Sequence, residues 1–272
     1  MKIGLVGFAG SGKTTAFNTM TGLDVPVGYG GDVRLGTVRV PDKRIDALTK
    51  IFLPKKKTYA EISFCDVPGE HGSHKKGLSP HGLQQIRDQE ALCLVLQDFN
   101  NPALEGAPDP LLDLESFHTE CVFADLEIIE KRLDRARKER ADAHEIATFE
   151  LAQANLEEER PLRLIPDADL DRSLIKGYGI LSDRPLLVVV NRDEEHAANP
   201  LTGPLDARIK EFGAAGLTLC ASIEADIAGM ELADQEEFLA DLGLKESALS
   251  RFIRSAYKLL DLISFFTVGE DE

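Results

Sequence analysis

The sequence contains no tryptophan, only four cysteines and no long apolar run among its 272 residues. The cysteines have no C-x-x-C spacing, and three of them stand in apolar segments, which is typical of buried reduced thiols rather than of disulfide bridges or a zinc site. No apolar run approaches the roughly 20 residues that a membrane-spanning helix needs, and glycine interrupts the N-terminal MKIGLVG too early for a secretion signal. We therefore expect a soluble, cytoplasmic protein.

Positive charge is also scarce. The chain has 31 Lys and Arg against 47 Asp and Glu, which gives a formal net charge of −16. Phosphate backbones and anionic lipids repel such a chain as a whole, so only a local basic patch can contact nucleic acid. We predict no membrane attachment and no DNA specificity. The length suits one large domain or one domain that carries an insertion.

Short apolar runs bounded by turn residues alternate with segments of helical pattern. This order is typical of a mainly parallel sheet with helices on both faces, so the sequence predicts an α/β fold. The run Leu186–Val190 is continuous and mostly β-branched, as in a strand that is buried on both sides. The expected strands are Lys2–Val6, Ala60–Cys65, Ala91–Leu96, Leu186–Val190 and Leu217–Ala221, with Val33–Val40 as a weaker candidate.

One segment breaks this alternation. Leu111–Arg160 contains neither glycine nor proline and is far longer than a typical crossover helix. We predict two antiparallel helices that turn near Arg140–His144, with a single long helix as the alternative, and a chain divided into 1–110, an inserted helical coiled coil at 111–165, and 166–272. The apolar stripe of this insertion follows coiled-coil spacing at Val122, Leu126, Ile129, Leu133 and Ala136 and continues through Ile146, Phe149 and Leu156.

Two clusters of basic residues stand out against the acidic background. Arg135, Arg137, Lys138 and Arg140 lie near the predicted tip of the insertion, and Lys55–Lys57 follow a proline. Such clusters most often mark a solvated surface. Contact with RNA or a ribosome is the alternative for both.

The stretch GFAGSGKTT carries the G-x-x-x-x-G-K-[ST] motif between the first predicted strand and a helical segment. In this context glycine-rich backbone N–H groups surround a phosphate, Lys13 reaches the β and γ oxygens, and the Thr14 hydroxyl binds Mg²⁺. The sequence therefore predicts a P-loop that binds ATP or GTP. Its phosphate-binding residues are Gly7, Phe8, Ala9, Gly10, Ser11, Gly12, Lys13, Thr14 and Thr15.

A second phosphate-side motif is D-x-x-G in FCDVPGEHG. Asp66 is expected to hold Mg²⁺ directly or through water, and the Gly69 N–H to bind the γ-phosphate, an interaction that hydrolysis removes. The following segment, Glu70–Gln85, is expected to be a mobile loop. A metal site is not expected from its three histidines, because they have no fixed carboxylate or cysteine partners; they are His71, His74 and His81.

The predicted strand Leu186–Val190 ends in the polar cluster NRDE. Open α/β sheets bind ligands at the carboxyl ends of their strands, so this cluster is expected to face one. In P-loop GTPases the corresponding strand ends in Asn-Lys-x-Asp, whose carboxylate accepts hydrogen bonds from the guanine edge. Here the motif is Asn-Arg-Asp-Glu.

Taken in order, GxxxxGKT, DxxG and a strand that ends in NxxE, with a helical insertion before the third, resemble the YchF/Obg-like ATPase family. The stretch from CASIEADIAG to FFTVGE is similar to that family's C-terminal G-domain sequence almost throughout, and so is ADLEIIEKRLDR in the insertion. The resemblance implies a P-loop G domain with a coiled-coil arm, ATP accepted in preference to GTP, and association with ribosomes. It also implies a TGS domain, which we expect to be lacking because Glu272 stands about where it would begin; a shortened chain and a natural short form both stay open.

The resemblance assigns the base-binding positions. Asn191 is expected to donate to N7 of either purine, and Glu194 takes the place of the family's glutamate. This side chain is one methylene longer than the aspartate that clamps guanine, so we expect it to lose paired hydrogen bonds to guanine and to permit adenine. The implied base-binding residues are Asn191, Arg192, Glu194, Ala221, Ser222 and Ile223.

The sequence departs from the family pattern at several positions. Gly10 stands where the family has a P-loop asparagine, and Ser222 where it has a lysine. No switch-I threonine is evident in DVPVGYGGDVRLG, so the second Mg²⁺ contact is left to water, to Asp32 or to nothing. The family's loop histidine after Phe99 is missing from NNPALEGAPDP.

Catalysis is expected to be slow. The predicted catalytic residues are Lys13, Gly69 and His71, but Glu70 stands where many GTPases have a glutamine that orients water, and a carboxylate there repels the γ-phosphate. We expect an ATP-hydrolysing switch with Mg²⁺ as cofactor and a ribosome or RNA as partner through the helical arm. The alternatives are a nucleotide-gated binding module with negligible hydrolysis, a GTP-preferring GTPase and, from the P-loop alone, a small-molecule kinase.

Overall fold

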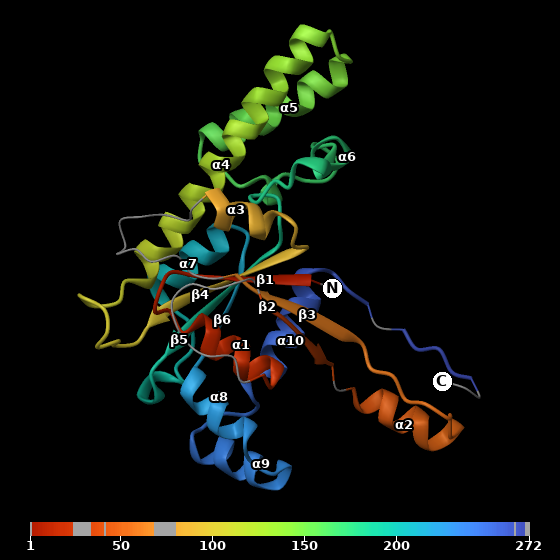
Figure 1. Ribbon diagram of the computed structural model, residues 1–272, viewed down its shortest axis with the longest axis vertical. Coiled ribbons are helices and arrows are strands. Elements are labelled where there is room, and N and C mark those ends of the chain that lie inside the picture. Colours follow the sequence, from red (N-terminus) through yellow and green to blue (C-terminus); the bar gives the residue numbers. More distant parts are fainter. Residues whose placement is uncertain (1, 24–33, 41, 68–79, 264, 270–272) are drawn as a thin grey trace.

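The computed structural model describes residues 2–23, 34–40, 42–67, 80–263 and 265–269. Within them, the strands form one sheet in the order β2-β3-β1-β4-β5-β6, in which β2 is antiparallel to β3 and the other neighbours are parallel (Figure 1). The predicted α/β fold with a mainly parallel sheet is thereby confirmed. The strands are β1 Lys2–Val6, β2 Arg34–Arg39, β3 Glu61–Asp66, β4 Ala91–Asp98, β5 Leu186–Arg192 and β6 Ala215–Leu219.

All six expected strands are present; the first has the expected ends, and the other five are shifted at one or both ends. The largest shift concerns the last one, predicted to end at Ala221. In the structure β6 ends at Leu219, and Ala221 is the first residue of helix α8, Ala221–Ala228. The run of apolar residues continued past the strand because Cys220 and Ala221 are both buried at the strand-to-helix turn.

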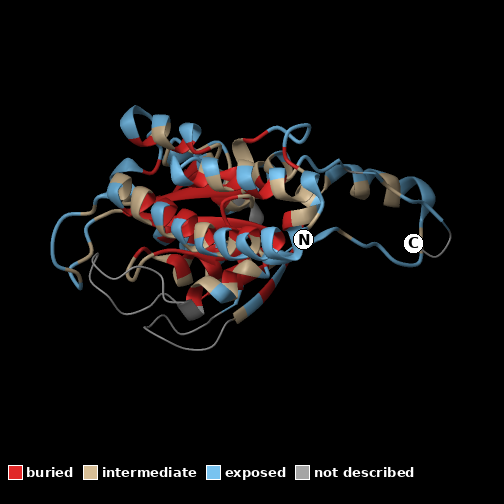
Figure 2. Ribbon diagram, turned by 90° about the horizontal axis from the view of Figure 1, so that it is seen from above, coloured by how far each residue is buried: buried red, intermediate tan, exposed pale blue. Residues whose placement is uncertain are grey.

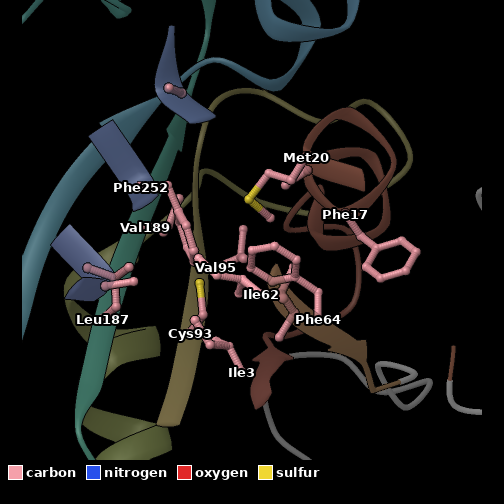
Figure 3. Close-up of a cluster of buried hydrophobic side chains, with 14 of the residues drawn as sticks. Ile3, Phe17, Met20, Ile62, Phe64, Cys93, Val95, Leu187, Val189 and Phe252 are labelled. Carbon is pink, nitrogen blue, oxygen red and sulfur yellow. The ribbon is translucent and has the colours of Figure 1, made fainter. Parts of the chain in front are cut away.

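Helices cover both faces of the sheet. Alternate strand residues point to opposite faces, which explains why β4 and β5 are apolar without interruption. Figure 3 shows the face on which Phe17 of α1 and Phe252 of α10 pack against residues such as Ile3, Phe64 and Val189. Helices α3, α4 and α7 cover the other face. The covering helices are α1 Lys13–Thr21, α3 Pro80–Arg87, α4 Pro110–Glu139, α7 Gly203–Glu211 and α10 Ala248–Leu259.

The insertion is a helical hairpin, so the alternative of a single long helix is wrong. Helix α4 ends at Glu139 and α5 spans Ala143–Glu157, and the two project together from the body (Figure 1). The turn needs no glycine because Arg140 takes the left-handed conformation at φ 56° and Asp142 caps α5 by accepting from the His144 N–H at 2.7 Å.

The apolar stripe predicted for the hairpin forms its core. Val122, Ile129 and Leu133 of α4 are buried with Phe149 and Leu156 of α5. Helix α4 also belongs to the sheet layer, since its earlier residues pack in the core beneath β4. The division into 1–110, 111–165 and 166–272 stays a prediction.

The remaining short elements complete the chain. Helix α2 projects from the body beside the segment that follows α10, and Figure 2 shows this projection as mostly exposed beside a buried sheet. In the parts of the chain that the structure describes, no helix is long and apolar enough to cross a membrane. The elements are α2 Lys43–Phe52, α6 Arg172–Ile175, α9 Leu232–Asp241, η1 Leu162–Leu164, η2 Lys176–Tyr178 and η3 Glu194–His196.

Candidate nucleotide-binding site

The predicted P-loop joins β1 to the first residue of α1, Lys13, at the carboxyl edge of the sheet. Gly10 and Gly12 both adopt left-handed backbone, with φ +84° and +82°. A Cβ at Gly12 would lie 2.2 Å from the Asn191 Nδ2, and a Cβ at Gly7 would lie 2.6 Å from the Val95 carbonyl oxygen. These positions therefore require glycine for backbone conformation, close approach or both.

The loop after β4 lies against the P-loop, an arrangement that the sequence did not indicate. The Asn101 Nδ2 donates to the Gly10 carbonyl oxygen at 3.2 Å, and a Cβ at Gly10 would lie 2.5 Å from Leu104 Cδ1. Space that a larger residue would need at position 10 is thus occupied by Leu104. A side chain at position 10 would therefore require Leu104 to shift.

The side chains predicted to hold phosphate and Mg²⁺ lie together in a buried cluster. Lys13 and Asp66 are 6% and 2% exposed, and the Lys13 Nζ donates to Asp66 Oδ1 at 2.5 Å. The Thr14 hydroxyl donates to Asp66 Oδ2 at 3.3 Å, and an Arg34 guanidinium nitrogen lies 3.9 Å from the same oxygen. Side chains of α1 and β2 therefore converge on one carboxylate at the end of β3.

This cluster can hold a magnesium ion. Two oxygen ligands on adjacent corners of a Mg²⁺ octahedron lie about 3 Å apart, given metal–oxygen distances of about 2.1 Å. The Thr14 and Asp66 oxygens, 3.3 Å apart, match that separation closely. Both are hard oxygen donors, the type that Mg²⁺ prefers.

The other predicted P-loop residues line the turn. Phe8 is half-buried against the core beneath the sheet. The Ser11 hydroxyl is buried without a hydrogen-bond partner among the described residues. The Thr15 carbonyl oxygen accepts from the Thr19 hydroxyl at 2.9 Å inside α1, and Ala9 is half-buried.

Asn191, at the end of β5, connects the P-loop to the start of α8, where the base is predicted to bind. Its amide nitrogen donates to the Ser11 carbonyl oxygen at 3.0 Å, and its amide oxygen accepts from the Ala221 N–H at 3.0 Å. The side chain is 3% exposed, so both bonds are shielded from water. An amide nitrogen carries two hydrogens, which leaves one for a purine nitrogen.

Arg192 points to the opposite face of the sheet from Asn191, as strand alternation requires. Its guanidinium donates to the Asp98 carboxylate and to the Asn199 carbonyl oxygen, both at 2.9 Å. The structure therefore does not place Arg192 with the other predicted base-binding side chains. It fixes the segment after β5 to the end of β4.

The acidic half of NRDE separates into two roles. Asp193 caps η3: its carboxylate accepts from the backbone N–H of His196 at 3.1 Å and lies 2.5 Å from that residue's Nδ1. Glu194 instead accepts from the Ser222 hydroxyl at 3.3 Å at the start of α8. Glu194, not Asp193, is thus the carboxylate left beside α8. Ile223 is buried in a separate apolar cluster, so only its backbone is available to a ligand.

A buried glutamate that sequence reasoning missed positions α8. Glu224 accepts from the Ala248 N–H at 2.6 Å and so caps α10 from the neighbouring helix. Burial raises the pKa of this carboxyl group, and the N–H donors of α10 oppose that rise. The only sequence signal was its place in the IEADI stretch that resembled the family.

The predicted switch residues Gly69, Glu70, His71 and His74 lie outside the described residues, as does Asp32. Part of the loop expected at Glu70–Gln85 is helical, because α3 begins at Pro80. His81 belongs to this helix. Within the residues that the structure describes, no group of three or more His, Cys, Asp or Glu side chains is placed to hold a metal ion.

Helix α3 ends in a buried ion pair with the helical hairpin. An Arg87 guanidinium nitrogen donates to the Asp125 carboxylate of α4 at 3.0 Å and to the Gly179 carbonyl oxygen at 2.7 Å. The same carboxylate accepts from the Leu181 and Ser182 N–H groups at 3.0 and 2.6 Å. Asp125 is fully buried. This pair therefore connects α3, α4 and the segment that leads into β5.

No protein-family model matches the chain. Its sequence is 33% identical over 287 residues to the ribosome-binding ATPase YchF of Bacillus subtilis, which covers 99% of this chain and 78% of that protein. It is 31% identical over 286 residues to the ribosome-binding ATPase YchF of Escherichia coli O157:H7. This match covers 100% of this chain and 79% of that protein.

Two solved structures are also similar to this chain. The structure of the Schizosaccharomyces pombe YchF GTPase matches with a TM-score of 0.83 at 27% identity, over 100% of this chain and 78% of that one. A GTP-binding protein of Pyrococcus horikoshii, 18% identical with a TM-score of 0.53, shares the fold over 97% of this chain and 80% of its own.

Proposed function

Because the chain belongs to the YchF family, we propose that it is a cytoplasmic, ATP-hydrolysing switch that associates with ribosomes. These similarities confirm the family resemblance that was drawn from the motifs. The curated relatives are described as ribosome-binding ATPases, whereas the solved relative is described as a GTPase. The nucleotide preference of this chain therefore needs its own argument.

The observation that carries the proposal is the cluster of Lys13, Thr14 and Asp66. Lys13 is held by a carboxylate at the mouth of the P-loop, and triphosphate oxygens can replace that carboxylate as its partner. Asp66 would then be free to hold Mg²⁺, with the Thr14 hydroxyl as a second oxygen ligand. When bound, Mg²⁺ neutralises charge on the β- and γ-phosphates. The protein's own contribution is a pre-formed cradle of backbone N–H groups and one lysine.

The base side supports adenine over guanine. Asn191 is committed to the P-loop and α8 and can offer one hydrogen to N7, which both purines share. Discrimination falls to Glu194, whose carboxylate is exposed and engages Ser222. A glutamate here is longer than the aspartate that fits the guanine edge. We therefore propose a preference for ATP of about ten-fold, or about 1.4 kcal/mol.

Hydrolysis without a partner is proposed to be slow. The cluster of Lys13, Thr14 and Asp66 stabilises charge but does not orient the attacking water. Gly69 is proposed to contact the γ-phosphate, and His71 is the candidate that approaches the water; Glu70 is proposed to turn away from the phosphate. We expect a rate well below one per second, as in unassisted P-loop switches.

The connection from nucleotide to arm is proposed to run through α3. This helix follows the D-x-x-G segment and ends at Arg87, which is bonded to Asp125 of α4. A displacement of α3 must either move α4 or break a buried ion pair, and breaking such a pair costs about 3–5 kcal/mol. The pair therefore supports transmission of the nucleotide state to the helical hairpin.

Phosphate release under multiple turnover, with and without ribosomes, tests the proposal. The switch model predicts slow release by the protein alone and faster release with ribosomes. A binding module that does not hydrolyse would release no phosphate in either case. Rapid release by the isolated protein that is abolished in His71→Ala would contradict partner dependence.

A further inference from the structure

Helix α2 and the segment that follows it carry a local excess of positive charge. Residues 42–60 contain six basic and two acidic side chains, a net charge of +4 in a chain of −16. Both acidic groups are already bound: Asp42 pairs with Arg44 at 2.7 Å, and Asp46 with Lys57 at 2.8 Å. The exposed side chains of Lys43, Lys50 and Lys56 form no ion pair among the described residues.

The tip of the helical hairpin has the same number of basic residues but a different balance. Residues 130–150 contain six basic and six acidic side chains, a net charge of zero with histidine neutral. Arg135 pairs with Glu139 and Arg137 with Glu150, both at 2.8 Å, and the Arg132 guanidinium binds Glu145. This cluster is largely neutralised within the hairpin itself, which favours the solvated-surface interpretation over a contact with RNA.

The α2 surface is also hollowed and aromatic. Helix α2, residues 54–60 and the segment after α10 enclose a pocket of about 460 Å³. Figure 1 shows α2 and that segment side by side, directed away from the sheet. Phe265 is 81% exposed, and the Arg44 guanidinium lies 4.8 Å from the centre of the Phe266 ring. The lining includes Lys56, Lys57, Tyr59, Tyr257, Phe265 and Phe266.

We propose that this α2 surface, formed by residues 42–60 with Tyr257, Phe265 and Phe266, binds single-stranded RNA. Unpaired lysines attract phosphates, and exposed aromatic faces stack on bases that are not paired. The pocket shares no lining residue with the P-loop, so it is a site separate from the nucleotide site. The inference rests on the proposed ribosome association and names the surface that contacts ribosomal RNA.

RNA fits this surface better than an anionic membrane does. A bilayer engages a continuous convex apolar face, whereas here four aromatic rings line a concavity with lysines on its wall. The rest of the chain carries strong negative charge, which a lipid surface would repel along its whole extent. A single RNA strand needs to approach only the basic projection.

Direct binding of RNA tests the inference. A labelled single-stranded RNA of about twelve nucleotides, close to the site sizes of such proteins, is titrated with the full chain and followed by fluorescence anisotropy at several salt concentrations. The double variant Lys50→Glu/Lys56→Glu is expected to lower affinity at least ten-fold. It should also flatten the salt dependence, by about 0.7 in slope for each phosphate that the variant no longer neutralises.

Two further variants separate stacking from charge and one surface from the other. Phe265→Ala is expected to lower affinity about five- to ten-fold with an unchanged salt slope, because the variant removes base stacking and leaves the lysines in place. Lys138→Glu/Arg140→Glu makes the same charge change at the hairpin tip and should alter affinity less than two-fold. Each altered side chain is exposed, so folding should be retained.

The inference is overturned if the wild-type chain does not bind this RNA, or if the hairpin variant loses as much affinity as the α2 variant. It is also overturned if Lys50→Glu/Lys56→Glu or Phe265→Ala instead abolishes binding to phosphatidylserine vesicles or self-association and leaves RNA binding intact. Phosphate release from ATP without ribosomes is measured on the same proteins and should be unchanged in all three variants. A wild type that binds RNA but releases no phosphate would contradict the ATPase proposal and leave this one standing.

Discussion

The phosphate side and the base side of the proposed nucleotide site are built differently. On the phosphate side, Lys13 and Asp66 are buried and joined at 2.5 Å. On the base side, Glu194 and Ser222 are exposed and meet at 3.3 Å. Charged interactions strengthen where water is excluded, so most of the binding free energy is expected from the phosphates. From this difference we predict that strength of binding and choice of base are determined in separate parts of the proposed site.

Asn191 is the exception, because it belongs to both sides. Its two buried hydrogen bonds join the Ser11 carbonyl oxygen to the Ala221 N–H. A change there should disturb the two sides together, whereas a change at Lys13 or Glu194 should disturb one. Removal of the metal and substitutions at these three residues test this division, beginning with the largest expected effect.

Removal of Mg²⁺ with a chelator should reduce turnover on the order of a thousand-fold, about 4 kcal/mol, because developing phosphate charge is no longer neutralised. Binding should weaken much less, since Lys13 and the backbone cradle remain. Phosphate release and nucleotide titration with and without chelator measure the two effects. Turnover that persists in chelator and is unaffected by Asp66→Asn would contradict the assignment of the Mg²⁺ site.

Lys13→Ala should weaken binding of ATP and GTP alike, on the order of 100-fold or about 3 kcal/mol, because it removes charge-assisted hydrogen bonds to the phosphates. Lys2→Ala, in the adjacent strand with an exposed side chain, is the matched control. Lys13→Met, which removes the charge but keeps a long side chain, tests whether the smaller volume of alanine contributes to the loss of affinity. Unchanged affinity and hydrolysis in Lys13→Ala would remove the P-loop assignment.

Asn191→Ala should lower the free energy of unfolding by about 2 kcal/mol, because it leaves two buried backbone groups without partners. It should weaken ATP and GTP binding by similar factors, about ten-fold, since it loosens the P-loop and α8 together. Chemical denaturation and competition titration measure these changes. A loss confined to one nucleotide would show that Asn191 selects the base and would break the division of roles.

Glu194→Asp should have the smallest effect, a shift of a few-fold in preference toward GTP. The shorter carboxylate suits the guanine edge, and a single imperfect hydrogen-bonded edge is at stake. Glu195→Asp, the same change at the next residue in η3, is the control. An ATP preference that is unchanged in Glu194→Asp would show that the length of this side chain does not determine the choice of base.

Much of the phosphate side was predictable from the sequence. The motif GxxxxGK[ST] directly after a strand places Lys13 and Thr14 by local backbone geometry, and D-x-x-G places Asp66 on the neighbouring strand. The glycines of this motif at positions 10 and 12 adopt the left-handed backbone that glycine permits. The parallel sheet was predictable because strands buried on both faces are continuously apolar.

The base side and the supporting contacts were harder to predict from the sequence. Several contacts join residues that are far apart in the sequence, and no local sequence pattern predicts them. Examples are Asn101 with Gly10, Glu224 with Ala248 and Arg87 with Asp125. Arg192 was assigned to the base through the motif, but its guanidinium is bound to Asp98. The hairpin turn at Arg140 was approximately placed, although a left-handed arginine gives no signal in residue propensities.

The division between the two sides is tested most directly by kcat/KM for ATP and GTP, measured by phosphate release on the wild type and on Lys13→Ala. We predict that the wild type uses both nucleotides, ATP about ten-fold better, and that the variant loses activity toward both by similar factors. This pattern would place strength of binding on the phosphate side and the modest choice on the base side. A higher kcat/KM for GTP, or a Lys13→Ala variant that retains ATP turnover, would contradict it.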